Sequence, residues 1–480
     1  MSLYEGKKNS LTEDQQIAVD AIVKFLKDYT PGNDFFTLQG LAGSGKTFSI
    51  VEALRSFKGS RIIIGGTISH SAKGVLESSL SDIEIPCYTV AQLLNMKQEI
   101  SDKGKIEFVP DIFSKPSPIN NADIIVIDEC SMIDRFLFDN LASKKSKNAK
   151  IIYIGDPFQL APINDSELDS HSFEHTKGKL HKPVRYTGPI MDLGSRLRQE
   201  IHHFNEGKAC SKFVINEWMR ELDNVDRTSC VDENGSGYIF LNNYEDAIRI
   251  AVQEFGGSDD VDSIRLIAFT NKVVDHLNDS VRASLYAGME EEDGVLPQLV
   301  EGELIISDGG YNTKQTSVIY NNQVFKVLKT HKTTHPETKL GLISPLLDPE
   351  PKFPNGVWNI VPILDKKRSG AEFDESLNDL KNIAKNDGRM WRKYYNYKQQ
   401  FAWFDYNYAL TSHRSQGRTF QDVIVFEKDI LEVGRTSTKI KLQSLYVACT
   451  RAKRRVYIFN SSYRVNQENL PADLRKQLGI

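Results

Sequence analysis

Several features that would assign a protein to a particular class are missing from this 480-residue sequence. No run of about 18 apolar residues occurs, so we expect no membrane-spanning helix and no membrane partner. The first residues, MSLYEGKKNS, lack the apolar stretch of a secretory signal, which favours a cytoplasmic protein. The length is enough for roughly three cores of about 150 residues each.

The sequence also has few cysteines and no excess of positive charge. The five cysteines form no CxxC pair and no His/Cys cluster at zinc spacing, so we expect reduced thiols and no structural metal. The 60 Lys and Arg residues are outnumbered by 64 Asp and Glu residues, giving a formal net charge of -4. Nucleic-acid-binding proteins are often basic overall, so a nucleic-acid site here has to be a local patch.

What is present is an alternation of helical and buried-strand patterns. The segment LTEDQQIAVDAIVKFLK combines a capping box, Thr12 and Gln15, with apolar residues at helical spacing. The runs IIVI before Asp128 and IIYIG before Asp156 do not alternate with polar residues, which is typical of parallel strands buried on both faces. Strands are also expected at 35–38 and 61–65, and in LIAF, VIVF and VYIF. The sequence therefore predicts an α/β fold.

Two stretches interrupt this alternation. KQEISDKGKIEFVP has a DKG turn between two short strand patterns, which predicts a hairpin within an insertion at 95–121. Between 290 and 404, Pro, Asn, Gly and Lys accompany strand-like pieces such as GELIIS, which predicts a β-rich insertion. The first α/β domain is then expected at 1–94 and 122–188, and the second at 189–289 and 405–480.

A glycine-rich segment between a strand and a helix predicts a phosphate-binding loop. Residues 40–47, GLAGSGKT, match the pattern GxxxxGK[ST]. Backbone amides of such a loop donate to phosphates, while Lys46 reaches the β- and γ-phosphates and the Thr47 hydroxyl binds Mg²⁺. The residues expected to hold ATP and Mg²⁺ are Gly40, Gly43, Ser44, Gly45, Lys46, Thr47 and, from the next motif, Asp128.

Polar side chains after the next two strands complete a hydrolytic set. Asp128 is expected to hold Mg²⁺, and Glu129 to orient or deprotonate the attacking water. Gln159, in GDPFQL, is placed to sense the γ-phosphate or the water. The transition state also needs positive charge, for which Arg185 and Arg451 are candidates. A passive P-loop binding protein would not need Glu129, so the set favours an ATP hydrolase.

Taken in order, these motifs resemble the superfamily 1 DNA helicases of the branch that contains RecD and the phage Dda-type helicases. LTEDQ resembles the Q-motif of that branch, and GLAGSGKT, DECS and GDPFQLAPI resemble its motifs I, II and III. KPVRYTGPI, LTSHRSQGRTFQDVIV and LYVACTRAK resemble motifs IV, V and VI, and AFTNKVVDHLN matches a further block. The resemblance extends from Leu11 to about Phe459, and the compact length favours the Dda type.

The resemblance implies roles that the residues alone do not give. It implies two RecA-like domains in tandem with ATP between them, adenine recognition by Gln15, and arginine-finger roles for Arg185 and Arg451. It makes the hairpin a strand-separating pin and the 290–404 insertion a domain with a small barrel that can touch the pin. Phe108 is then either the wedge that stacks on the first base pair or a residue that holds the hairpin in place.

A path for single-stranded DNA across both domains is implied as well. The expected contacts are Ser69, His70, Lys73, Asn271, Thr411 and His413. The sequence departs from the family pattern at Ala91, where a His is usual, and at Arg414, where Lys is commoner; the arginine keeps the charge but changes its geometry. The aromatic-rich stretch 391–408 fits either base stacking or packing of the insertion onto the second domain.

We therefore expect an ATP-dependent DNA helicase that translocates on single strands and separates duplexes, with 5′-to-3′ polarity by resemblance only. The alternative is a single-strand-stimulated ATPase that displaces bound proteins without efficient unwinding. The expected partners are single-stranded DNA, junctions between single- and double-stranded DNA, and replication or single-strand-binding proteins. We expect the enzyme to act as a monomer, and a phage-encoded enzyme to work in the host cytoplasm.

Overall fold

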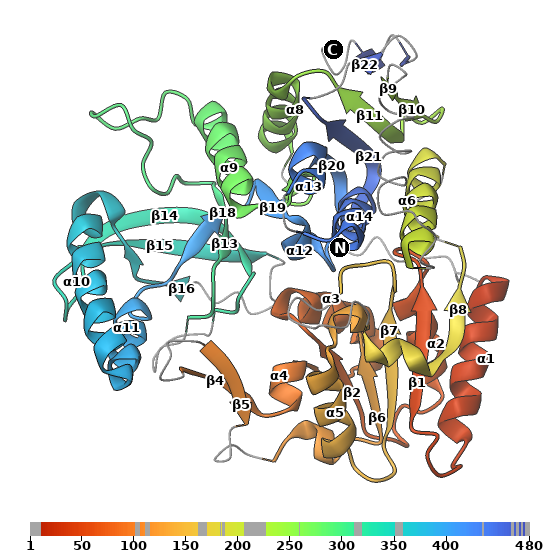
Figure 1. Ribbon diagram of the computed structural model, residues 1–480. Coiled ribbons are helices and arrows are strands. Elements are labelled where there is room, and N and C mark those ends of the chain that lie inside the picture. The colour runs from red at the N-terminus through yellow and green to blue at the C-terminus, as the bar shows by residue number, and fades with distance from the viewer. Residues whose placement is uncertain are drawn as a thin grey trace. The chain divides into compact units, whose positions relative to one another are not determined.

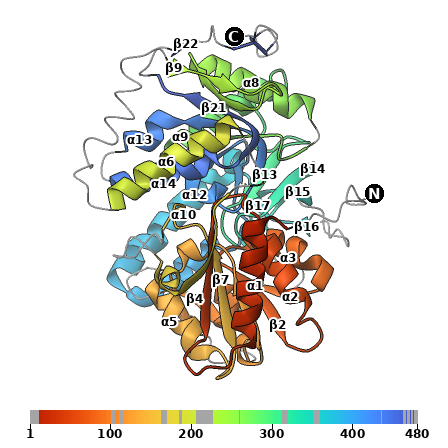
Figure 2. The ribbon, with the colours of Figure 1, turned by 90° about the vertical axis from the view of Figure 1, so that its right-hand side faces the viewer.

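The computed structural model describes residues 11–100, 106–110, 116–161, 170–182, 184, 188–205, 227–258, 260–311, 319–350, 359–433, 436–461, 465–466, 470–471 and 474–475 (Figures 1 and 2). Contacts divide the chain into two units. Unit 1 comprises 1–68, 72–95 and 112–208, and unit 2 comprises 69–71, 96–111 and 209–480. Among the described residues, no helix combines the length and the apolar character needed to cross a bilayer.

Unit 1 is built on a six-stranded parallel sheet with the order β3-β2-β6-β7-β1-β8. Its strands are β1 (Phe35–Gly40), β2 (Ile63–Thr67), β3 (Cys87–Thr89), β6 (Ile124–Ile127), β7 (Lys150–Gly155) and β8 (Thr176–Leu180). Its helices are α1 (Glu13–Lys27), α2 (Lys46–Arg55), α3 (His70–Leu80), α4 (Val90–Leu93), α5 (Arg135–Lys144) and α6 (Pro189–Asn205). The strands expected from the unalternating apolar runs are confirmed.

Helices cover both faces of this sheet, as buried parallel strands require. Phe36 and Leu38 of β1 pack with α1 and α2 in one core. Their neighbour Phe35 points to the other face, where its ring lies 5.4 Å from that of Phe138 on α5. Figure 2 shows α5 on one side of the strands and α2 and α3 on the other.

The sheet of unit 2 has the order β10-β11-β21-β20-β12-β19, and only β10 runs antiparallel to its neighbour. Its strands are β10 (Cys230–Val231), β11 (Gly237–Leu241), β12 (Ile264–Ala268), β19 (Ala409–Thr411), β20 (Phe420–Phe426) and β21 (Ala452–Phe459). The helices around it are α8 (Tyr244–Gly257), α9 (Asn271–Leu285), α12 (Ser412–Ser415), α13 (Glu427–Leu431) and α14 (Thr438–Cys449). A short parallel pair, β9 (Arg227–Thr228) and β22 (Val465–Asn466), forms a separate two-stranded sheet.

The insertion contains an antiparallel sheet but is less uniformly β than expected. The sheet has the order β16-β15-β14-β13-β18, with β17 paired to β15. Its strands are β13 (Leu304–Ser307), β14 (Val324–Thr334), β15 (Gly341–Glu350), β16 (Asn359–Ile360), β17 (Ile363–Leu364) and β18 (Phe404–Tyr406). Residues 366–398, however, form α10 (Lys366–Asn386) and α11 (Trp391–Lys398). Figure 1 shows this helical pair beside β14 and β15.

The aromatic-rich stretch contributes to packing. The ring of Tyr397, on α11, stacks on Phe373 of α10 at 5.3 Å between centroids. Phe401 meets the same Phe373 ring edge-on, also at 5.3 Å, and Trp403 packs against this cluster. Tyr408 belongs to the core of the main sheet in unit 2. These contacts favour the packing interpretation for this half of the stretch.

The predicted hairpin is present as β4 (Met96–Ile100) and β5 (Ile106–Pro110), which pair antiparallel with Gln98 opposite Phe108. Contacts group it with unit 2. The side chain of Phe108 lies outside the described residues. Contacts also group α6 with unit 1, although the predicted second domain begins with that helix. The RecA-like domain boundaries stay predictions.

Candidate nucleotide and nucleic-acid sites

The phosphate-binding loop joins β1 to α2 as the motif predicts. Strand β1 ends at Gly40 and α2 begins at Lys46. Gly43 and Gly45 have φ values of 74° and 81°, which side chains rarely tolerate. The Lys46 ammonium donates to the carbonyl oxygens of Gly40 at 2.8 Å and Leu41 at 2.9 Å, so the loop curls around it.

Gln15 lies against this loop. Its Nε2 donates to the Ser44 carbonyl oxygen at 3.2 Å, and its Oε1 accepts from the Thr12 amide at 3.0 Å. A Cβ on Gly45 would lie 2.3 Å from Nε2, so only glycine leaves room for this contact. The capping box that starts α1 therefore also ties α1 to the phosphate-binding loop. Adenine recognition by Gln15 stays a prediction.

A buried carboxylate that the sequence analysis did not single out supports the loop from the neighbouring strand. Asp156 follows β7, which lies beside β1, and its side chain is fully buried. Its Oδ2 accepts from the Ala42 amide at 2.9 Å, and its Oδ1 accepts from the Phe158 amide at 3.1 Å. Asp156 thus fixes the backbone of the phosphate-binding loop and of the GDPFQL segment together.

The acidic pair follows β6. Asp128 Oδ1 accepts from the Glu129 amide at 2.8 Å, and Glu129 has a φ of 54°. Such left-handed backbone costs a non-glycine residue about 1–3 kcal/mol and is often found at functional sites. Here the left-handed backbone at Glu129 turns the chain sharply between β6, which ends at Ile127, and the 3₁₀ turn Cys130–Met132.

The thiol of Cys130, directly after the acidic pair, is fully buried. Burial raises the pKa of Cys130, and a hydrogen bond with Ser172 lowers it; Asp128 and Glu129 add smaller raising effects, and Lys46 a smaller lowering one. All three charged groups therefore act on one buried atom. Cys130 in turn fits against β7 only because Gly155 lacks a side chain, since a Cβ there would lie 2.5 Å from Sγ.

Two further polar groups are suited to a ligand with phosphates. Ser44 Oγ and Gln159 Oε1 are buried, and neither has a hydrogen-bond partner within the part of the chain that the structure describes. Buried polar atoms of this kind normally have partners, so these atoms fit a site that closes around a nucleotide. No group of three or more His, Cys, Asp and Glu side chains among the described residues is arranged to hold a metal by itself.

The two arginine-finger candidates differ in what the structure describes. Arg185 lies outside the described residues. Arg451 lies between α14 and β21, is 2% exposed, and donates to the carbonyl oxygens of Val447 and Arg418 at 3.1 and 3.2 Å. Its Nη2 has no partner among the described residues. The guanidinium is held by unit 2 with one donor group left for a further acceptor.

The candidate DNA-contacting residues at the start of α3 interact with other side chains of this chain. The His70 ring stacks on Tyr320 with 4.0 Å between centroids, and both residues are grouped with unit 2. Lys73 forms an ion pair with Glu77 one turn later at 3.3 Å. Ser69 directly precedes the helix. Their contacts with DNA stay predictions.

Two of the candidates in unit 2 line one cavity. Asn271, at the start of α9, and Thr411, which caps α12, lie on a cavity of about 170 Å³. The charged side chains around this cavity are those of Asp275, Asp308, Asp405 and Arg414. Burial lowers the pKa of His413, whose ring meets Phe269 edge-on at 5.7 Å.

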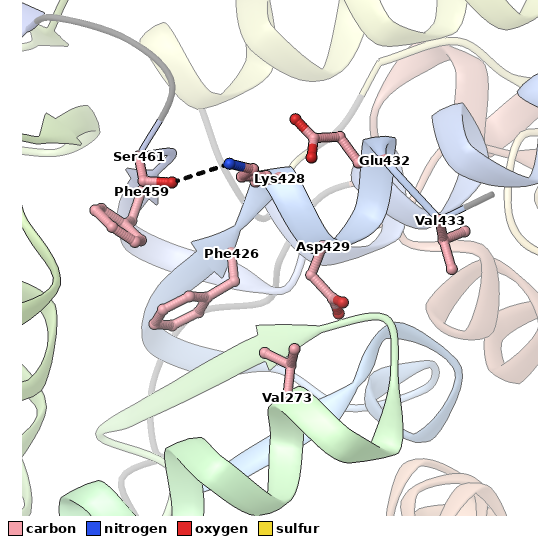
Figure 3. Close-up of a pocket in the computed structure, with 8 residues that line it drawn as sticks. All are labelled: Val273, Phe426, Lys428, Asp429, Glu432, Val433, Phe459 and Ser461. Carbon is pink, nitrogen blue, oxygen red and sulfur yellow. Dashed lines mark hydrogen bonds between the residues drawn. The ribbon is translucent and has the colours of Figure 1, made fainter.

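A larger cavity, of about 370 Å³, lies where β20 and β21 end (Figure 3). Phe426, Phe459 and Val273 give it an apolar floor, while Lys428 and Glu432 stand at its rim. Asp429 lies on its wall and accepts hydrogen bonds from the amides of Phe269 and Thr270 at 2.7 and 2.8 Å. That carboxylate holds the chain in place immediately before Asn271.

These features define the class of protein. A phosphate-binding loop and an acidic pair at the ends of strands in one parallel sheet, with a second, mainly parallel sheet that carries a buried arginine, describe a P-loop nucleotide hydrolase with two RecA-like domains. An AAA domain model matches residues 10–224, and a model of the UvrD-like helicase C-terminal domain matches residues 406–459.

The relatives narrow this class to a family. The ATP-dependent DNA helicase Dda of Enterobacteria phage T4 is 24% identical over 94% of this chain and 99% of its own. The RecD subunit of the RecBCD enzyme from Buchnera aphidicola is 39% identical over 17% of this chain and 12% of its own. A Bacteroides Pif1 helicase structure with ADP-AlF3 and single-stranded DNA aligns over 98% of this chain and 97% of its own at 15% identity, with a TM-score of 0.49. These sequence similarities support a superfamily 1 DNA helicase, an ATP-hydrolysing enzyme.

Proposed function

We propose that this enzyme couples ATP hydrolysis to movement along single-stranded DNA in the 5′-to-3′ direction and thereby opens duplex DNA. The observation that carries the proposal is the braced nucleotide site of unit 1. There the loop around Lys46, the buried carboxylate of Asp156 and the turn at Glu129 meet at the same edge of one sheet. The polarity rests on the resemblance to Dda-type helicases.

In the proposed mechanism, each group has one task. Lys46 would leave the carbonyl oxygens of Gly40 and Leu41 for the β- and γ-phosphates of ATP. The Thr47 hydroxyl and the Asp128 carboxylate would hold Mg²⁺, which supplies charge neutralisation at the phosphate oxygens. Glu129 would orient the attacking water and accept its proton.

Two further groups would respond to the γ-phosphate. Gln159 would orient the water with its unpaired amide oxygen, which accepts a hydrogen bond, or sense the γ-phosphate by donating from its NH₂ group. The unpaired Nη2 of Arg451 would stabilise the charge that develops in the transition state. Arg185 is the second candidate for that task.

Single-stranded DNA would be held by Ser69, His70 and Lys73 and, in unit 2, by Asn271, Thr411 and His413. Phosphate contacts by cationic side chains such as Lys73 would release counterions, so binding should weaken as salt is raised. Strand separation would fall to the hairpin β4–β5, with Phe108 as the proposed wedge. A Phe108→Ala variant should then lose unwinding more than single-strand translocation.

The experiment compares matched duplexes with a 5′ or a 3′ single-stranded tail, with ATP and Mg²⁺. Wild type should open only the 5′-tailed duplex, and Lys46→Ala should open neither. Lys58→Ala is the matched control, because Lys58 is an exposed lysine of the same unit that pairs with Glu84 at 3.0 Å. Opening of only the 3′-tailed duplex would overturn the polarity. If neither opens while single strands still stimulate hydrolysis, the enzyme is a translocase that displaces bound proteins.

A further inference from the structure

Arg414, where motif V departs from the family pattern, is held by two carboxylates on the antiparallel sheet that contains β13 and β18. Arg414 Nη1 donates to Asp405 Oδ2 at 2.6 Å, and its Nη2 donates to Asp308 Oδ1 at 2.7 Å. Asp405 lies in β18 and Asp308 directly follows β13. These strands pair with each other, with Asp405 opposite Ile306. One guanidinium therefore holds the ends of two neighbouring strands of the insertion sheet.

The same arginine belongs to the turn that carries the DNA candidates. Helix α12 comprises only Ser412–Ser415, and the Thr411 hydroxyl caps it by accepting from the Arg414 amide at 3.2 Å. Arg418, just beyond the turn, reaches the insertion too, where it donates to the Asn322 carbonyl oxygen at 2.7 Å. The turn is thus tied to the insertion at two points, both made by arginine side chains.

A lysine at 414 could not make the same connection. The planar guanidinium presents two N–H groups in a fixed fork, whereas a lysine ammonium is a single point charge on a flexible stem. The two bonds use different arms of that fork, so the arginine fixes the direction of the turn as well as its distance. Only 24% of the Arg414 side chain is exposed, whereas its partners Asp308 and Asp405 are 58% and 40% exposed, so the fork is fixed from the arginine side.

We propose that Arg414 is a positioning residue that makes the insertion sheet follow the DNA-contacting turn 411–415 through Asp308 and Asp405. This inference rests on the proposed function, because it assumes that single-stranded DNA contacts that turn. When DNA shifts the turn, the insertion moves with it, and ATP-driven steps along DNA are passed to the part of the enzyme outside the two main sheets.

The test uses the full-length protein and the double substitution Asp308→Asn, Asp405→Asn, which keeps the shape of both side chains and removes their charge. Arg414→Lys is the second variant, since it keeps the positive charge and removes the fork. Asp293→Asn is the matched control. Asp293 also lies in the insertion and pairs with Lys367 at 2.5 Å, but both of these side chains are exposed and neither is bonded to Arg414.

Two readouts separate positioning from mere stability. The first is amide hydrogen exchange with and without a single-stranded oligonucleotide. In wild type, DNA should change exchange in 411–415 and in β13 and β18; in both variants, only in 411–415. The second is the number of base pairs opened per ATP hydrolysed, which should fall about five-fold in the variants. Mutations that disturb the coupling between two sites typically change that coupling roughly 2- to 30-fold. The DNA-free ATPase rate of the double variant and all values for Asp293→Asn should match wild type.

Three results would overturn the proposal. If the variants show the same DNA-induced changes in hydrogen exchange as wild type and open as many base pairs per ATP, the ion pairs do not transmit movement to the insertion sheet. A parallel loss of ATPase, unwinding and thermal stability would make the connection structural only. Tighter DNA binding with stronger ATPase stimulation would mean that the carboxylates mask Arg414 from DNA. Failure of wild type to bind single strands or open any duplex would instead refute the proposed function itself.

Discussion

The carboxylate of Asp156 should be essential for ATP affinity although it belongs to neither the phosphate-binding loop nor the acidic pair. Asp156→Asn keeps the shape of the side chain and one acceptor oxygen, but it turns an NH₂ group toward the second of the two amides, Ala42 and Phe158. A hydrogen bond to a charged group contributes about 1.5–3 kcal/mol. We therefore expect the braced loop to lose about 2 kcal/mol, which weakens ATP binding roughly 30-fold.

The assay is a titration with a fluorescent ATP analogue, combined with thermal denaturation. Asp123→Asn is the matched control, because Asp123 Oδ2 also accepts a backbone amide of the same sheet, that of Ile62 at 2.8 Å, but before β6. Its effect on ATP affinity should stay within about two-fold, as for most surface substitutions. If Asp156→Asn binds ATP as tightly as wild type while folding normally, the bracing role of this carboxylate is refuted.

Three further substitutions test other parts of the molecule. Glu129→Gln should still bind ATP but hydrolyse it about 10²- to 10⁴-fold more slowly in a phosphate-release assay, and near-normal turnover would exclude Glu129 as the base. Glu303→Gln leaves Arg282 buried without its charged partner and should lower the free energy of unfolding in urea by about 3 kcal/mol. Glu291→Gln, at a partly exposed ion pair, should change it little. Burial lowers the pKa of His413 from its usual 6.5, so its neutral form favours folding above that pH, and this stability is lost as the pH falls through the lowered pKa. His413→Gln should therefore lose less stability than wild type when denaturation is measured between about pH 7 and pH 5. Equal losses would contradict a lowered pKa of His413 as the cause.

Local patterns predicted the parts of the fold that depend on local physics. The capping box of Thr12 and Gln15 starts α1 as expected, and the unalternating runs before Asp128 and Asp156 are buried parallel strands. The phosphate-binding loop follows from its own spacing. The capping box and the loop are decided by interactions within a few residues. The two strands are decided by continuous apolar runs, which have to be buried on both faces of a sheet.

Other features depend on contacts that sequence order does not reveal. The role of Asp156 arises from an amide 114 positions earlier. Helix α10 was missed because its charged sequence buries only Ser369, Phe373 and Ala384, which is too little for a clear helical period. The departure at Arg414 was visible in the sequence, but the two carboxylates that explain its geometry are 9 and 106 positions away.

The pairing of β13 with β18 also bears on how such an enzyme could have acquired its insertion. The chain leaves the second sheet region through β13 and returns through β18, and Ile305 lies opposite Tyr406. Paired antiparallel residues have Cα atoms only about 4.5–5.5 Å apart, so a short hairpin turn could join the same two strands. A segment whose ends meet in this way can be gained, lost or exchanged as a module with little loop-closure entropy at stake. Lineages could then vary this part of the enzyme while the ATP-hydrolysing core stayed the same.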